Sequence, residues 1–151
     1  MKEKKTGKTL LVSACLLGVH CRYDGGSQKR DLLDSLSERY HLVPVCPEQL
    51  GGLPTPRTPA ERVGERVMTK DGRDVTAEYR RGAEEALHLA QKLGCQTAIL
   101  KARSPSCGSG SVYDGTFSGG LTSGDGVTAE LLKKNGIRVL SDEEIGTLLE
   151  E

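Results

Sequence analysis

Short apolar runs alternate along the chain with longer stretches in which apolar residues recur every three or four positions. Each short run is continuous and bounded by polar or turn residues, as expected for strands buried on both faces of a sheet. These runs cover residues 8–15, 41–46, 97–101 and 137–140. The most regular periodic stretch spans residues 76–93 and is followed by Gly94, which suits the end of a helix.

The same pattern predicts three further helices. One begins near Ser27 and carries a stripe of leucines, one covers residues 127–135, and the last follows Ser141, which forms a capping box with Glu144. Strands that alternate with helices favour a parallel sheet, because right-handed crossovers bring successive strands side by side. We therefore predict an α/β fold: a single three-layer Rossmann-like domain with a mainly parallel sheet of about four strands.

Two segments interrupt this alternation. Residues 47–59 contain four prolines and two glycines, a density that predicts a long irregular loop without regular structure. Residues 62–75 contain an Asp-Gly step between short apolar stretches, which predicts a small hairpin that could shield a site at the sheet edge. Residues 1–7 are predicted to be a polar N-terminal tail, and the domain is expected to span residues 1–151.

The composition argues against several classes of protein. The chain carries 21 Lys and Arg against 21 Asp and Glu, so no basic field favours a large nucleic acid as partner. Its charged start and the short apolar run that follows fit neither a signal peptide nor a membrane span, which favours a cytoplasmic protein without a membrane partner. An odd number of cysteines, five, favours reduced thiols over a disulfide framework.

Three cysteines, Cys15, Cys46 and Cys107, fall where three apolar runs end. Because parallel strands end at one sheet edge, these thiols are expected to meet there. Three thiolates without a Cys-x-x-Cys knuckle fit a 4Fe-4S cluster with one open iron better than they fit structural zinc. Alternatively they are unligated thiols, since free cysteine is a common buried residue. Cys21 could supply a fourth ligand, whereas Cys95, between a helix and a strand, is expected to be inert.

Polar residues beside these cysteines are candidates for catalysis and binding. Glu48, two residues after Cys46, is placed to activate water or carry a proton, and Ser104 could donate to a substrate from the turn before Cys107. The glycine-rich turn that follows lacks a full dinucleotide fingerprint, although its amides could bind a base or an anion. Alternatively, each candidate is an ordinary solvated residue of a loop or turn. The expected substrate-binding residues are Arg22, Tyr23, Asp24, Ser106, Gly108, Ser109 and Gly110.

Several motifs in a fixed order resemble one bacterial family. They are SACLLG, CRYDG, CPEQLGGLPTPR, KARSPSCGSG, VYDGTF and GVTAELL, and they extend over nearly the whole chain. Together they are similar to the thiouracil desulfidases, a family formerly classed as a domain of unknown function. The ordered set is far more specific than any single motif within it.

The resemblance implies a 4Fe-4S cluster held by Cys15, Cys46 and Cys107, with Glu48 and Ser104 as catalytic residues. The implied reaction is a non-redox desulfuration, in which water replaces the sulfur of 2-thiouracil or a similar thio-base and sulfide leaves. The expected partner is thus a small-molecule thio-base, bound by a monomer or small homo-oligomer. Two alternatives stay open: a non-catalytic module that binds a nucleotide or other small ligand with zinc or no metal, and an iron-sulfur electron carrier.

Overall fold

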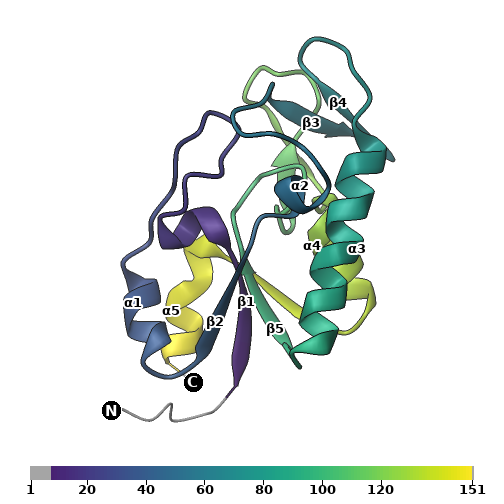
Figure 1. Cartoon of the computed structure of the whole chain (residues 1–151). Coiled ribbons are helices and arrows are strands. Elements are labelled where there is room, and N and C mark those ends of the chain that lie inside the picture. The colour runs from purple at the N-terminus through teal and green to yellow at the C-terminus, as the bar shows by residue number, and fades with distance from the viewer. Residues whose placement is uncertain (1–7, 151) are drawn as a thin grey trace.

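A four-stranded parallel sheet forms the centre of the structure, a computed structural model that describes residues 8–150 (Figure 1). The polar tail predicted at residues 1–7 lies outside the described residues. The predicted α/β, Rossmann-like fold with a mainly parallel sheet of four strands is confirmed. In spatial order the strands are β2 (His41–Val45), β1 (Thr9–Ser13), β5 (Thr97–Leu100) and β8 (Arg138–Ser141).

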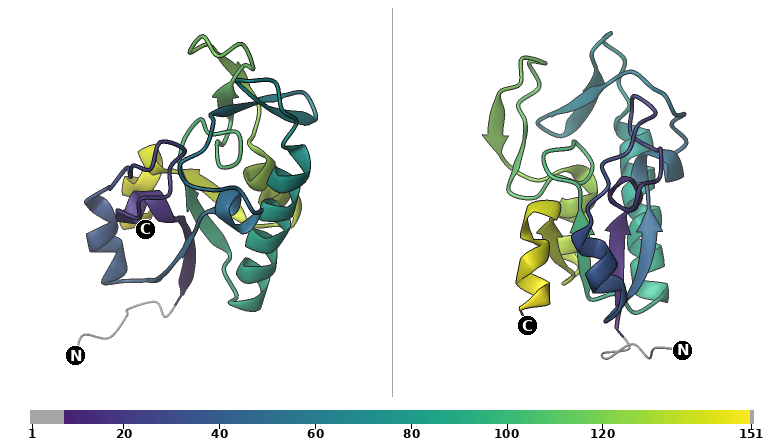
Figure 2. Two further views of the ribbon diagram at one scale, coloured as in Figure 1. Left: turned by 45° about the horizontal axis from the view of Figure 1, so that its top comes forward. Right: turned by 90° about the vertical axis from the view of Figure 1, so that its left-hand side faces the viewer.

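Helices cover both faces of this sheet, which gives three layers (Figure 2). Side chains of β1 alternate between the two faces: Leu10 and Val12 pack in one apolar cluster and Leu11 in the other. A continuous apolar run is therefore required, because both faces of the central strand are buried. The helices are α1 (Leu32–Ser37) and α5 (Ile145–Leu149) on one face, and α3 (Thr76–Lys92) and α4 (Val127–Lys134) on the other.

Helix α3 is the helix expected from the most regular periodicity, and its buried stripe consists mostly of small residues. Small side chains on this stripe allow close packing against the sheet and against a second helix. The buried residues of α3 are Tyr79, Gly82, Ala83, Ala86 and Ala90.

Among residues 8–150, no helix combines the length and the apolar character that a membrane span needs.

The ends of β1 and β2 differ from those predicted. Strand β1 stops before Cys15, which lies in a short 3-10 helix, η1 (Ala14–Leu17). Strand β2 stops before Cys46, which precedes a short helix, α2 (Pro47–Leu50). The prediction that residues 47–59 hold no regular structure was therefore wrong for their first turn. Proline is compatible with the first position of a helix because its missing N–H has no partner there in any case.

The first α-helix begins at Leu32 and not near Ser27. The amide of Gln28 donates instead to the carbonyl oxygen of Cys15 at 2.9 Å, and that of Arg30 also donates to a carbonyl of η1. The segment thus pairs its backbone with η1 before the helix starts. The local sequence around Ser27 favours a cap, but this tertiary pairing overrides the preference.

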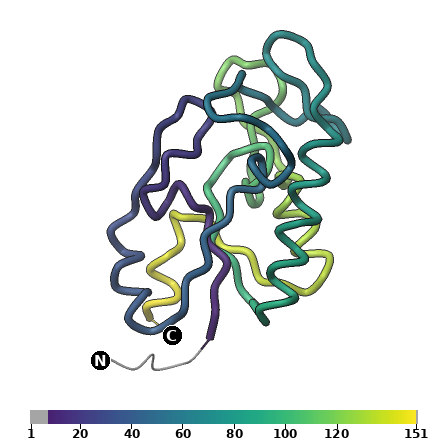
Figure 3. The backbone as a smooth tube through the Cα atoms, viewed as in Figure 1, coloured from purple at the N-terminus to yellow at the C-terminus, as the bar shows by residue number. Residues whose placement is uncertain are grey.

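Two small antiparallel strand pairs stand above the carboxyl ends of the sheet strands, and we call them and their connecting turns the cap (Figure 3). The expected hairpin is formed by β3 (Ala60–Val63) and β4 (Arg66–Thr69), but it turns earlier than predicted, at Gly64, whose φ of +60° suits a two-residue turn. The second pair, β6 (Ser111–Tyr113) and β7 (Leu121–Ser123), lies in the glycine-rich stretch predicted as a loop. Contacts between β3 and β6 join the two pairs.

Candidate functional site

A cavity of about 420 Å³ lies at the carboxyl edge of the sheet, between the strand ends and the cap. Four of the five cysteines contribute to its wall, namely Cys15, Cys21, Cys46 and Cys107. The fifth, Cys95, is buried in the apolar cluster beneath α3 and α4. The structure thus brings the three cysteines predicted as ligands to one cavity, and it places Cys21 there as well.

Each of the three cysteines predicted as ligands follows a different strand. Cys15 lies in η1 directly after β1, Cys46 lies between β2 and α2, and Cys107 lies in the loop after β5. Since parallel strands end at the same edge, residues far apart in sequence share this cavity.

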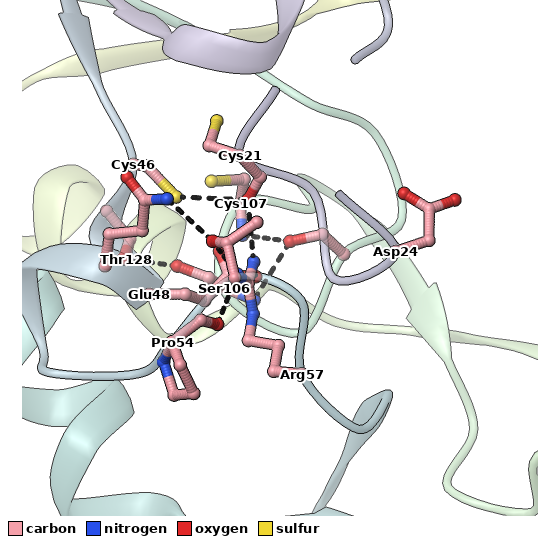
Figure 4. Close-up of polar contacts among 12 residues, drawn as sticks. Cys21, Asp24, Cys46, Glu48, Pro54, Arg57, Ser106, Cys107 and Thr128 are labelled. Atoms are coloured by element: carbon pink, nitrogen blue, oxygen red, sulfur yellow. Dashed lines mark hydrogen bonds and ion pairs between the residues drawn. The ribbon is translucent and has the colours of Figure 1, made fainter. Parts of the chain in front are cut away.

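The thiol of Cys21 is within hydrogen-bonding reach of Cys15 and Cys46. Cys46 also donates its thiol hydrogen to the carbonyl oxygen of Cys21 at 3.7 Å (Figure 4). The hydrogen bond with Cys15 raises the pKa of Cys21 to about 11. Burial also raises this pKa, whereas the hydrogen bond with Cys46 lowers it. Burial raises the pKa of Cys107 to about 12. The thiol of Cys107 is therefore neutral at pH 7, so metal binding to it would release a proton.

The donor set suits a cluster better than a single ion. Within residues 8–150, no three Cys, His, Asp or Glu side chains are arranged to hold one metal ion. A 4Fe-4S cluster makes a different demand, because each of its thiolates binds a different iron. Three thiols on the wall of one cavity, each from a separate strand end, fit that demand.

Glu48 reaches the cavity from α2, and close packing of α2 against α3 fixes its position. A Cβ on Gly82 would clash with the carbonyl oxygen of Pro47, and a Cβ on Gly51 would clash with that of Glu78. Glycine at these two positions therefore lets the two backbones approach each other. The consequence is a rigid support for the carboxylate.

Arg57, which the sequence analysis missed, is the partner of Glu48. Its Nη2 donates to Glu48 Oε2 at 3.0 Å, and the two side chains are only 6% and 15% exposed. The same guanidinium donates to the carbonyl oxygens of Cys21 and Pro54. Burial would lower the pKa of Arg57, but the charge of Glu48 raises it overall. The arginine ends the CPEQLGGLPTPR motif, yet no linear pattern shows that this segment folds back onto the glutamate.

Replacing Arg57 by Met should lower the free energy of unfolding by about 3 kcal/mol, because it leaves Glu48 buried without its partner. The matched control is Arg73→Met, which removes an ion pair with Asp71 whose side chains are 65% and 56% exposed. That change should leave stability nearly unchanged, since exposed pairs contribute little. Urea denaturation of the metal-free variants measures both effects. Equal losses in the two variants would show that the buried pair has no special weight.

Ser104 lines the cavity, and its oxygen organises the turn that carries Cys107. Ser104 Oγ accepts hydrogen bonds from the amides of Ser106 at 3.1 Å and of Cys107 at 2.8 Å. With the oxygen used as an acceptor, the hydroxyl hydrogen is the part that can be donated toward a bound molecule.

Replacing Ser104 by Ala should lower the free energy of unfolding by about 1 kcal/mol, because two amides of the turn lose their acceptor. Ser104→Thr keeps the hydroxyl and should restore most of this loss. Thermal unfolding compares the variants, and faster amide hydrogen exchange at Cys107 in the alanine variant locates the effect. Unchanged exchange at this amide would contradict the structural part of the role.

Of the predicted substrate-binding residues, Arg22 and Tyr23 line the cavity, and the other five do not. The carboxylate of Asp24 accepts from the amide of Gly26 and points away from the cysteines (Figure 4). Ser106 is fully buried, and its hydroxyl bonds that of Thr128 at 2.8 Å. The remaining three, Gly108, Ser109 and Gly110, lie in the turn after Cys107.

The first amides of α4 are also engaged within the protein. Those of Val127 and Thr128 donate to the carbonyl oxygens of Pro105 and Ser106, each at 2.8 Å. The helix N-terminus therefore fastens the loop that carries Cys107 and does not offer these amides to a base or an anion.

Several wall residues were not singled out from the sequence. Tyr79 comes from α3, and burial together with the nearby charge of Glu48 raises the pKa of its hydroxyl. The cap contributes Glu61 and Phe117, among others. Phe117 ends the VYDGTF motif, whereas no linear signal marks Glu61 or Tyr79 as part of the site. The two cap residues join the site through the folding of the cap over the sheet edge, and Tyr79 joins it from α3.

Comparison with known proteins gives a consistent result. The sequence profile of a family described as 2-thiouracil desulfurase matches residues 10–144. The protein YbbK of Bacillus subtilis (strain 168), described as uncharacterized, is 43% identical over 150 aligned positions, and the alignment covers 93% of this chain and 99% of YbbK. The solved structure of the 4Fe-4S-dependent thiouracil desulfidase TudS is 49% identical and superposes with a TM-score of 0.89, covering 94% of this chain and 95% of that one.

Proposed function

The chain belongs to the 2-thiouracil desulfurase family, and on this basis we propose that it is a 4Fe-4S-dependent desulfidase acting on a thiolated base such as 2-thiouracil. In the proposed reaction a C=S group and water give a C=O group and hydrogen sulfide, with no net oxidation or reduction. The observation that supports this most directly is a single cavity whose wall holds Cys15, Cys46 and Cys107 beside Glu48.

Cys15, Cys46 and Cys107 are proposed to hold the cluster and to leave one iron without a protein ligand. When bound, the cluster would supply a Lewis-acidic iron for the thiocarbonyl sulfur. Cys21 is proposed to support Cys15 and Cys46 through hydrogen bonds without binding iron.

Glu48 is proposed to move the protons of the reaction. Arg57 donates a hydrogen bond to Oε2. Within residues 8–150 no side chain bonds the other carboxylate oxygen, so that oxygen is available to water or to the base. As water attacks the ring carbon, the carboxylate accepts a proton from it and then returns a proton to the departing sulfur. The ion pair with Arg57 keeps the carboxylate in one orientation for both transfers.

Ser104 is proposed to orient the base by donating its hydroxyl hydrogen, since its oxygen already accepts two amide hydrogens. Arg22 and Tyr23 are proposed to contact the substrate from the wall segment that follows η1 in the chain. The guanidinium of Arg22 lies 5.8 Å from the ring centre of Tyr23, which holds the two side chains together.

Anaerobic reconstitution followed by a sulfide-release assay tests the proposal. We expect roughly four irons per chain, a brown colour, and release of sulfide together with the oxo-base from at least one member of a panel of thio-bases. A loaded protein that releases no sulfide from 2-thiouracil, 4-thiouracil or their nucleosides would contradict it. Purification with stoichiometric zinc and no iron would favour the non-catalytic alternative.

A further inference from the structure

Phe117 is the one phenylalanine of the chain, and it lines the cavity from the cap. Its φ of +58° lies in the left-handed region, which bulky residues rarely adopt. The same loop places glycines at 115 and 119, where φ is +93° and +84°. A phenylalanine in a backbone conformation that suits glycine indicates that its side chain has a functional role at the cavity.

Glu61, on β3, holds this loop in place. Its Oε1 accepts hydrogen bonds from the amide of Gly115 at 2.9 Å and from that of Phe117 at 3.0 Å. Glu61 is only 8% exposed, so these bonds form in a poorly solvated setting where they are strengthened. The bond to Phe117 acts on the residue with the unusual φ, and it therefore helps to maintain that conformation.

The loop is also closed on itself. Asp114 Oδ1 accepts from the amide of Thr116 at 3.0 Å and from its hydroxyl at 2.6 Å. The amide of Asp114 donates to the carbonyl oxygen of Gly120 at 3.0 Å. Together with the bonds to Glu61, these bonds hold the backbone of the loop, and with it Phe117, in one position.

We propose that Phe117 packs against the ring face of the bound base and thereby selects planar substrates, with Glu61 as the positioning residue. This inference rests on the proposed function, because that function supplies a planar ring as ligand. The phenyl side chain has no group that donates, accepts or titrates, so it contributes through contact and exclusion of water. Its effect should therefore fall on substrate binding and not on the chemical step.

The first test compares Phe117→Ala with Phe117→Tyr. Loss of a stacking partner should raise KM for 2-thiouracil about tenfold while kcat stays within about threefold. Phe117→Tyr keeps the ring face and should behave nearly as the wild type. Iron content is measured on each preparation, so that kinetic constants refer to loaded protein.

The second test separates positioning from proton transfer at Glu61. Glu61→Ala should reproduce the rise in KM, because both loop amides lose their acceptor. Glu61→Gln should restore most of the affinity, because a single oxygen accepts both amides and glutamine retains such an oxygen. A glutamate that carried protons would not be replaced by glutamine, so the pair of variants distinguishes the two roles.

A binding measurement keeps this inference distinct from the proposed function. Calorimetric titration with 2-thiouracil is carried out in the Glu48→Gln background, where turnover is slow, with Phe117 and with Ala at position 117. A tenfold rise in Kd supports the inference even where the wild type releases no sulfide, a result that would refute only the proposed function. No detectable binding, an unchanged Kd, or equal losses in Glu61→Gln and Glu61→Ala would each overturn the inference.

Discussion

Replacing Glu48 by Gln should leave the cluster in place and lower the rate of desulfidation at least about a hundredfold, the low end for general acid-base catalysis. The amide can still accept a hydrogen bond from Arg57, but it cannot take up and return a proton. The side chain comes from α2 and is not a proposed ligand, so cluster assembly should not require it.

Iron content and single-turnover sulfide release should be measured on the same Glu48→Gln preparation. Normal iron with slow release is the expected outcome. Turnover at the wild-type rate would move the proton transfer to Ser104 or to bulk water. Loss of iron would instead make Glu48 part of the cluster site.

Replacing Cys15, Cys46 or Cys107 by Ser should remove most of the cluster, because a neutral hydroxyl is a poor substitute for a soft thiolate on iron. Cys95→Ser is the matched control, since Cys95 is buried among apolar residues beneath α3 and α4. This variant should keep a near-normal content of the iron-sulfur cluster. Iron and acid-labile sulfide per chain, after identical anaerobic reconstitution, give the comparison. Retention of the cluster in any of the first three variants would remove that cysteine from the ligand set.

Cys21→Ser is the most informative member of this series. We expect near-normal cluster content, because a serine hydroxyl can replace the hydrogen bonds to Cys15 and Cys46. A large loss would make Cys21 a fourth ligand and leave no open iron for a substrate. Cys21 follows Cys15 by six residues in the sequence, and the folded chain places it on the wall of the same cavity.

The fold was largely predictable because its signals are local. A continuous apolar run such as residues 10–12 requires burial on both faces, and the periodicity of residues 76–93 suits one amphipathic helix. In two of the places where the predictions failed, backbone hydrogen bonds between separate stretches of the chain overrode local preference. Gln28 bonds η1 and delays the first α-helix, and the glycine-rich stretch pairs with itself as β6 and β7.

The sequence by itself determined the parallel α/β architecture and the arrival of Cys15, Cys46 and Cys107 at one edge, because strands that alternate with helices run parallel and their carboxyl ends share one edge of the sheet. Only the tertiary structure decided which other side chains share that cavity. Arg57 reaches Glu48 because the proline-rich segment folds back, and Glu61 meets the loop of Phe117 across more than fifty residues. Such contacts depend on how loops of irregular backbone pack, and no periodic spacing in the chain encodes them.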